Sequence, residues 1–178
     1  SNSFAAEKEG FYGTAEAGVT LNSGNTDAKT VTAKVDLFDN LENWRLNLLA
    51  SKIYSFAAGA RTADKLNAQF KADYKLGEHD YIWALIRYEN DKFNGFQYEL
   101  SEAIGYGRRL IDEEYTTLDL EVGPGLYQAK LDTGATQSEI TGRAAANFKW
   151  TISEGVLFGQ RLAALFGKAA TVGTKIFS

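Results

Sequence analysis

Residues 95–126 alternate polar and apolar side chains over two consecutive runs, and this pattern constrains the fold more than any other feature of the chain. In the second run Leu118 and Leu120 fall on one face. Asp119 and Glu121 fall on the other. Successive side chains leave a β-strand on opposite faces, so the pattern predicts a hairpin whose arms meet at an acidic turn. Each arm exceeds the usual strand of about five or six residues and matches the roughly 9–11 tilted residues that cross a bilayer.

The same alternation recurs along most of the chain, with turn-forming residues between the runs. Besides the two arms of the hairpin, the predicted strands are residues 11–22, 28–38, 44–51, 65–75, 81–89, 139–150, 155–166 and 168–177. The predicted hairpins follow one another with no predicted helix between them, which is typical of an up-and-down antiparallel barrel. The predicted fold class is all-β: an up-and-down antiparallel transmembrane β-barrel of about ten strands, or an incomplete or larger barrel. We expect residues 1–9 to form a flexible lead-in and residues 10–178 a single barrel domain.

The composition excludes several classes of protein. Hydrophobic content is 44% and no window approaches the ~18 apolar residues of a transmembrane helix, which excludes a helical membrane protein. The absence of a long apolar window does not exclude a membrane β-barrel, because only alternate residues of its strands need be apolar. The net charge of −4 gives no basic footprint for nucleic acid, so no nucleic-acid partner is expected. The absence of cysteine removes disulfides and thiolate metal sites.

The connections between predicted strands alternate in length. Those at 22–27, 57–64, 90–95 and 131–137 are longer than those at 39–43, 76–80, 111–114 and 153–155. Outer-membrane barrels show this asymmetry, with short periplasmic turns and longer external loops.

Alternation alone does not say whether the apolar face meets lipid or a protein core, and a soluble barrel of the lipocalin type is the alternative. The length of the strands favours lipid, and so does the density of opposite charges on the polar face. Such charges would neutralise one another in a narrow lumen. The residues that we expect to form this lumen charge network are Lys71, Asp73, Arg87, Glu89, Glu99, Asp119, Glu121, Arg143 and Lys149.

Aromatic residues gather near the strand ends, where amphipathic rings would lie at the two membrane interfaces. The expected interface aromatics are Phe11, Trp44, Tyr74, Tyr88, Tyr106, Phe148 and Trp150. We expect Tyr81 and Tyr127 in the same bands. Glu102 falls on the lipid-facing side of its strand and contradicts this arrangement unless a bulge resets the register.

Three central motifs carry a resemblance to a known family. They are RYENDKFNGF at 87–96, GYGRRLID at 105–112 and LDLEVGPG at 118–125, with an SGNTD turn at 23–27. This pattern resembles a Gram-negative family, domain of unknown function 481, described as salt-induced outer-membrane proteins. The resemblance covers roughly residues 18–153. It implies a bacterial outer-membrane location and a role in envelope adaptation to osmotic stress. The expected partners are membrane lipid, lipopolysaccharide and the barrel-assembly machinery.

The chain offers little catalytic chemistry. Its single histidine, His79, lies in a charged turn, where an imidazole is usually just solvated, so neither a metal site nor a cofactor is expected. Asp119 and Glu121 share one face of one strand and could do acid–base work. We expect Arg87 and Arg143 instead to tie these carboxylates into the lumen network.

The first functional hypothesis is therefore a non-enzymatic outer-membrane barrel with a plugged or narrow charged lumen, porin-like only for ions and very small solutes. About eight strands already leave an interior that side chains fill. One alternative is an envelope lipid-modifying enzyme with its site among external-loop residues Arg61, Asp91, Lys92 and Asp132. The other is a soluble lipocalin-like barrel that binds an apolar ligand.

Overall fold

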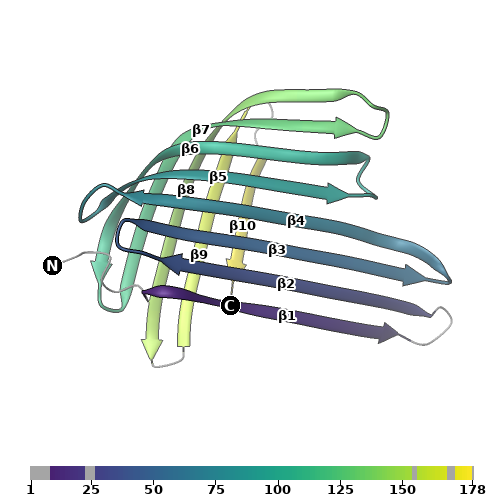
Figure 1. The fold of residues 1–178 in the computed structure, drawn as a ribbon, viewed down its shortest axis with the longest axis horizontal. Helices are drawn as coiled ribbons and strands as arrows, with labels where there is room; N and C mark the ends of the chain where they lie inside the picture. The colour runs from purple at the N-terminus through teal and green to yellow at the C-terminus, as the bar shows by residue number, and fades with distance from the viewer. Residues whose placement is uncertain (1–8, 23–26, 154–155, 168–170, 178) are drawn as a thin grey trace.

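A computed structural model describes residues 9–22, 27–153, 156–167 and 171–177, which form one antiparallel sheet (Figure 1). Its strands are β1 (Gly10–Asn22), β2 (Ala28–Asn40), β3 (Trp44–Ala57), β4 (Ala60–Lys75), β5 (Asp80–Asp91), β6 (Phe96–Glu113), β7 (Thr116–Leu131), β8 (Thr136–Ser153), β9 (Val156–Phe166) and β10 (Thr171–Phe177). The ten strands follow one another in sequence order across the sheet. The all-β, up-and-down fold predicted from the alternation is confirmed, with β1 and β10 as the two edges of the sheet among the described residues.

The sheet is strongly curved, so that β8 to β10 run across the view at a steep angle to β1 to β4 (Figure 1). Side-chain contacts between distant strands show which face is concave. Arg45 of β3 lies 3.5 Å from Asp119 of β7. Neighbouring strands are about 4.8 Å apart, so β3 and β7 would be about 19 Å apart in a flat sheet. The face that carries Arg45 and Asp119 is therefore the concave one, here called the inner face.

The opposite, outer face is apolar along most of its length. One row of paired residues crosses it from β1 to β8: Gly13, Leu37, Leu48, Phe70, Ile86, Glu102, Leu126 and Ile140. Ile104 and Ile140 on this face are 62% and 80% exposed. The described part of the chain contains no helix with the length and hydropathy needed to cross a membrane.

Glu102 is one exception on this face. It pairs with Ile86 of β5 and Leu126 of β7 without a register shift and is exposed. The shifts along β6 lie instead near its two ends, between Phe96 and Tyr98 and between Arg109 and Ile111. No bulge turns Glu102 inward, because the ladders on both sides hold this stretch of β6 in register, and Glu102 therefore remains an exception to the apolar outer face.

The prediction of a longer loop at 57–64 is wrong. The β3–β4 turn consists of Ala58 and Gly59 alone, and both have positive φ values of 50° and 77°. Positive φ at both central residues is what the two-residue type I′ hairpin turn requires. Polar residues after the turn look like loop in the sequence, yet they continue the β4 ladder against β3. The predicted lead-in at 1–9 lies outside the described residues except for Glu9, and β1 begins at Gly10.

Candidate functional site

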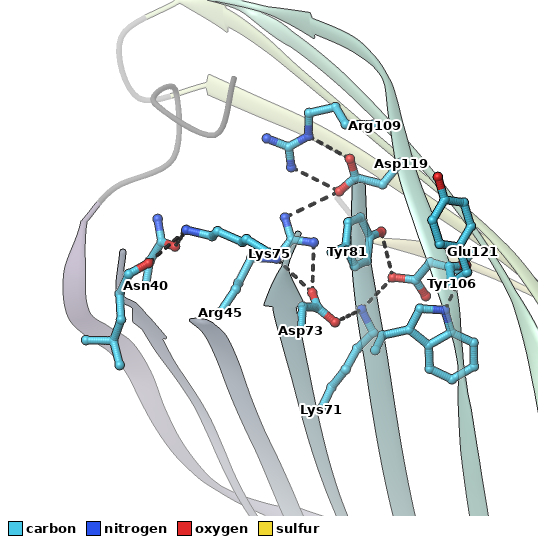
Figure 2. A network of polar contacts seen from close by, with 12 residues as sticks. Asn40, Arg45, Lys71, Asp73, Lys75, Tyr81, Tyr106, Arg109, Asp119 and Glu121 are labelled. Carbon is cyan, nitrogen blue, oxygen red and sulfur yellow. Dashed lines mark hydrogen bonds and ion pairs between the residues drawn. The ribbon is translucent and has the colours of Figure 1, made fainter. Parts of the chain in front are cut away.

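Charged side chains from β3, β4, β6 and β7 meet on the inner face, toward the end of the sheet where β1 begins (Figure 2). Arg143 of β8 joins them through Glu121. We call this set the inner network. Its members are Arg45, Lys71, Asp73, Arg109, Asp112, Asp119, Glu121 and Arg143. Alternation places all of them except Asp112 on the polar side of their strands, and the register shift between Arg109 and Ile111 turns Asp112 to the same side. The curvature of the sheet then brings the strands together.

Glu121 of β7 contacts side chains from three other strands. Its Oε1 lies 2.5 Å from Lys71 Nζ of β4, and its Oε2 lies 2.7 Å from Arg143 Nη1 of β8. The Tyr81 hydroxyl of β5 donates a further hydrogen bond of 3.0 Å to Oε1. The Glu121 side chain is fully buried. Four strands are thus joined through one carboxylate.

Asp119 and Asp73 are linked through a shared arginine. Arg109 donates two parallel hydrogen bonds to Asp119, from Nε at 2.7 Å and from Nη2 at 3.0 Å. Arg45 reaches across the concave inner face, donating from Nη2 to Asp73 at 2.8 Å and from Nη1 to Asp119 at 3.5 Å. Bidentate pairing by arginine fixes geometry as well as charge. These contacts hold β3, β4, β6 and β7 in one arrangement.

The inner network balances its own charge. Four cations, Arg45, Lys71, Arg109 and Arg143, face four carboxylates, Asp73, Asp112, Asp119 and Glu121. Separating buried charges from water is costly unless each is paired and hydrogen-bonded. A balanced set satisfies that requirement, because each of these charges is paired with another member of the inner network.

Two aromatic rings, Tyr81 and Trp83 of β5, pack beneath the charges and are fully buried. Arg143 stacks over the Trp83 ring at 4.8 Å from its centroid. The rings fit because the facing residues of β6 are glycines. A Cβ on Gly105 would collide with the Trp83 ring and with backbone of β7, and a Cβ on Gly107 would collide with the Tyr81 ring. The central GYG motif therefore makes room for this aromatic layer.

Other predicted lumen residues lie on the inner face but outside the inner network. Glu89 lies 2.6 Å from Lys65 and 3.4 Å from Arg87. Glu99 accepts a hydrogen bond of 2.6 Å from the Tyr127 hydroxyl. These contacts form a second polar group, nearer the end of the sheet where β1 finishes at Asn22.

One expectation about partners differs from the structure. Lys149 lies on the inner side of β8, exposed at the end of the strand, where it pairs in register with Thr117. Arg87, expected beside Asp119, pairs in register with Ser101 near the middle of β6, whereas Asp119 pairs with Arg109 close to the end of that strand. The arginine that binds Asp119 is therefore Arg109.

The seven aromatics expected at membrane interfaces all lie on the outer face. Phe11, Trp44, Tyr74, Tyr106 and Trp150 are exposed, and Tyr88 and Phe148 are half-buried. One row of paired residues holds Trp44, Tyr74, Ile82 and Tyr106 side by side. The Trp44 and Tyr74 rings meet edge to face with centroids 4.9 Å apart.

The same expectation was wrong for two tyrosines. Tyr81 is fully buried, and its hydroxyl and that of Tyr127 donate to the inner-face carboxylates Glu121 and Glu99. Both residues lie on the polar side of their strands. The side of the strand on which a residue falls therefore decides whether its ring points inward, even near a strand end.

Within the described ranges, no group of three or more His, Cys, Asp or Glu side chains is placed to hold a metal ion. His79 lies in the connection between β4 and β5, where its carbonyl accepts a hydrogen bond of 2.8 Å from the Arg109 backbone N–H. This part of the chain contributes a backbone contact to β6.

The sequence of this chain is similar to those of known proteins. The family described as "Protein of unknown function, DUF481" matches residues 15–176. The chain belongs to the DUF481 family. The uncharacterized protein YdiY of Escherichia coli (strain K12) is 23% identical over 176 residues, which cover 96% of this chain and 68% of that relative. No solved structure matches the chain. The family assignment made from the motifs is thus confirmed.

In this DUF481 chain the central motifs supply much of the inner network. GYGRRLID provides Arg109 and Asp112, and LDLEVGPG provides Asp119 and Glu121. Arg109 was missed as a lumen residue although the alternation, continued past Gly105 and Gly107, places it on the polar face.

Arg45 was missed for another reason. It lies on the polar side of β3, but its partner Asp119 is four strands away, and no local pattern indicates that contact.

Proposed function

We propose that this chain is a small, non-enzymatic outer-membrane β-barrel whose charged interior is closed by the inner network. The observation that carries the proposal is the distribution of side chains between the two faces. Large apolar residues cover the outer face, while Arg109, Asp119 and Glu121 are buried on the inner one. A soluble barrel has the opposite arrangement, since its apolar side chains fill the interior.

The dimensions of the outer face support the same proposal. The apolar positions of β4 run from Leu66 to Tyr74, close to the roughly 9–11 tilted residues that span a bilayer. The exposed row of Trp44, Tyr74 and Tyr106 lies at one end of this span, as aromatic girdles do at membrane interfaces. Contiguous exposed apolar surface of this extent is rare on a soluble monomer.

The inner network supports a closed interior. Its side chains reach across the concave face from β3 to β8 and neutralise one another, so they fill space and offer no free charge to a solute. The role of such a barrel is envelope maintenance under osmotic or salt stress, with at most ions and very small solutes passing.

Tryptophan quenching tests the membrane proposal. The chain has three tryptophans; Trp44 and Trp150 are exposed on the outer face, and Trp83 is fully buried on the inner one. In vesicles of lipids brominated near the headgroup, we expect wild-type emission to be quenched strongly. The variant W44F/W150F, which retains Trp83 alone, should keep its emission in the same vesicles.

Vesicles without bromine provide the control for both proteins. Equal emission of wild type in brominated and plain vesicles would overturn the membrane proposal. A protein that also stays monodisperse without detergent would favour the soluble, apolar-ligand barrel.

A further inference from the structure

A second group of charges lies on the outer face, at the Asn22 end of the sheet. Asp64 of β4 pairs with Tyr54 of β3, two residues before the exposed Leu66 on the same face. Arg61 Nη1 lies 3.0 Å and Lys92 Nζ 3.2 Å from Asp64 Oδ2, and Lys52 Nζ contacts Asp64 Oδ1. We call these four residues the outer cluster.

The outer cluster is unbalanced, unlike the inner network. Three cations share one carboxylate, which leaves a formal charge of +2. The Asp64 side chain is only 4% exposed, whereas those of Lys52, Arg61 and Lys92 are 44%, 41% and 57% exposed. The buried Asp64 carboxylate thus positions the three cations, whose exposed surface remains accessible to another anion.

The cations are held in place by more than Asp64. The Lys92 backbone N–H donates a hydrogen bond of 3.1 Å to the Asp64 carbonyl, which fixes the β5–β6 connection against β4. The Arg61 guanidinium lies 4.8 Å from the centroid of the Tyr54 ring. Prior ordering of the donors lowers the entropic cost of binding.

The position of the outer cluster indicates an amphiphilic ligand. Lys52 pairs directly with Leu66, so the charges begin where the apolar span of β3 and β4 ends. Exposed Leu48 and Phe70 lie farther along the same face. A phosphate offers several anionic oxygens to converging lysine and arginine donors. Acyl chains attached to that phosphate would lie along the apolar strands.

We propose that the outer cluster binds the phosphate group of a membrane lipid headgroup in the external leaflet, the phosphorylated glycolipid of lipopolysaccharide. At this end the strands are separated by five residues between Asn22 and Ala28, by two between Ala57 and Ala60, and by four between Asp91 and Phe96 and between Leu131 and Thr136. The connections 41–43, 76–79 and 114–115 at the other end have three, four and two residues. Longer loops are external in such barrels. This inference rests on the proposed function, because a headgroup reaches the outer cluster only if the outer face is embedded in lipid.

Native mass spectrometry of the full chain in a neutral detergent tests the inference. The probes are lipid A, lipid A with its phosphates removed by phosphatase, and inorganic phosphate. We expect lipid A to bind at least tenfold more tightly than its dephosphorylated form, and inorganic phosphate at equal concentration to displace little of it. Equal binding of the two lipids would overturn the inference, and full displacement by inorganic phosphate would reassign the cluster to free phosphate.

Substitutions with opposite expected effects localise the binding. D64N removes the competing carboxylate and should tighten lipid A binding several-fold. The variant K52Q/R61Q/K92Q/D64N removes all four charges without leaving Asp64 unpaired, and should weaken it at least tenfold. K130A is the matched control, since Lys130 is a single cation on the outer face of β7 near the same end. Equal losses in K130A and the quadruple variant would contradict the assignment.

Tryptophan quenching of the quadruple variant separates the two proposals. If bromine still quenches the variant but lipid A binding does not depend on phosphate, the outer cluster is not a headgroup site and the membrane proposal stands. If bromine does not quench wild type, the membrane proposal fails first.

Discussion

Glu121 shows how strongly the inner face depends on single charges. Replacing it by glutamine leaves Lys71 and Arg143 without their shared carboxylate in a buried setting. Removing one partner from a buried ion pair costs about 3–5 kcal/mol, because the remaining charge stays desolvated. We expect E121Q to lower the free energy of unfolding by about that amount, measured by urea denaturation of the detergent-folded protein.

The control for this substitution is E113Q. Glu113 is exposed at the end of β6, and the same chemical change there should alter the free energy of unfolding by less than about 0.5 kcal/mol. Equal stabilities of E121Q and E113Q would mean that the inner network contributes specificity of the fold but little stability.

At the scale of the element, the β3–β4 hairpin has an alanine at a turn position whose backbone conformation favours other residue types. Ala58 has a φ of 50°, a left-handed conformation that costs an ordinary residue about 1 kcal/mol or more. Asparagine adopts this conformation more readily, and Asn-Gly is the preferred pair for the type I′ turn. We therefore expect A58N to raise the free energy of unfolding by up to about 1 kcal/mol, measured by the same urea denaturation.

The neighbouring glycine gives the opposite test. Gly59 also has positive φ, and nothing lies within 4 Å of the position that a Cβ would take, so G59A isolates the backbone effect. It should destabilise the protein. Stabilisation by G59A, or destabilisation by A58N, would show that the turn does not have this geometry in solution.

At the scale of the whole molecule, the inner network should decide whether the barrel conducts. Paired removal of Arg109 and Asp119 side chains opens space without a net change of charge. In planar bilayers we expect wild type to show little or no unit conductance and R109A/D119A to show discrete, larger events.

A matched pair on the other face controls for loss of charge and of stability. Arg108, next in sequence to Arg109, lies 3.4 Å from Asp80 on the outer face, and R108A/D80A should leave conductance unchanged. Large wild-type conductance, or equal increases in both double variants, would contradict closure of the interior by the inner network.

The sequence by itself determined the strands and the side of each strand on which a residue lies, because a period of two is a local property of the extended backbone. It therefore identified Lys71, Asp73, Asp119, Glu121 and Arg143 as members of one polar face. The same rule, applied to Tyr81 instead of its position near a strand end, would have placed that ring correctly.

Only the tertiary structure decided which face is concave and which charges meet. Alternation is unchanged when the two faces of a sheet are exchanged, so it cannot give the direction of curvature. Arg45 and Asp119 are separated by 74 residues and meet because the sheet bends between β3 and β7. Partners on distant strands depend on the curvature and register of every strand between them, and that information is not local to either residue.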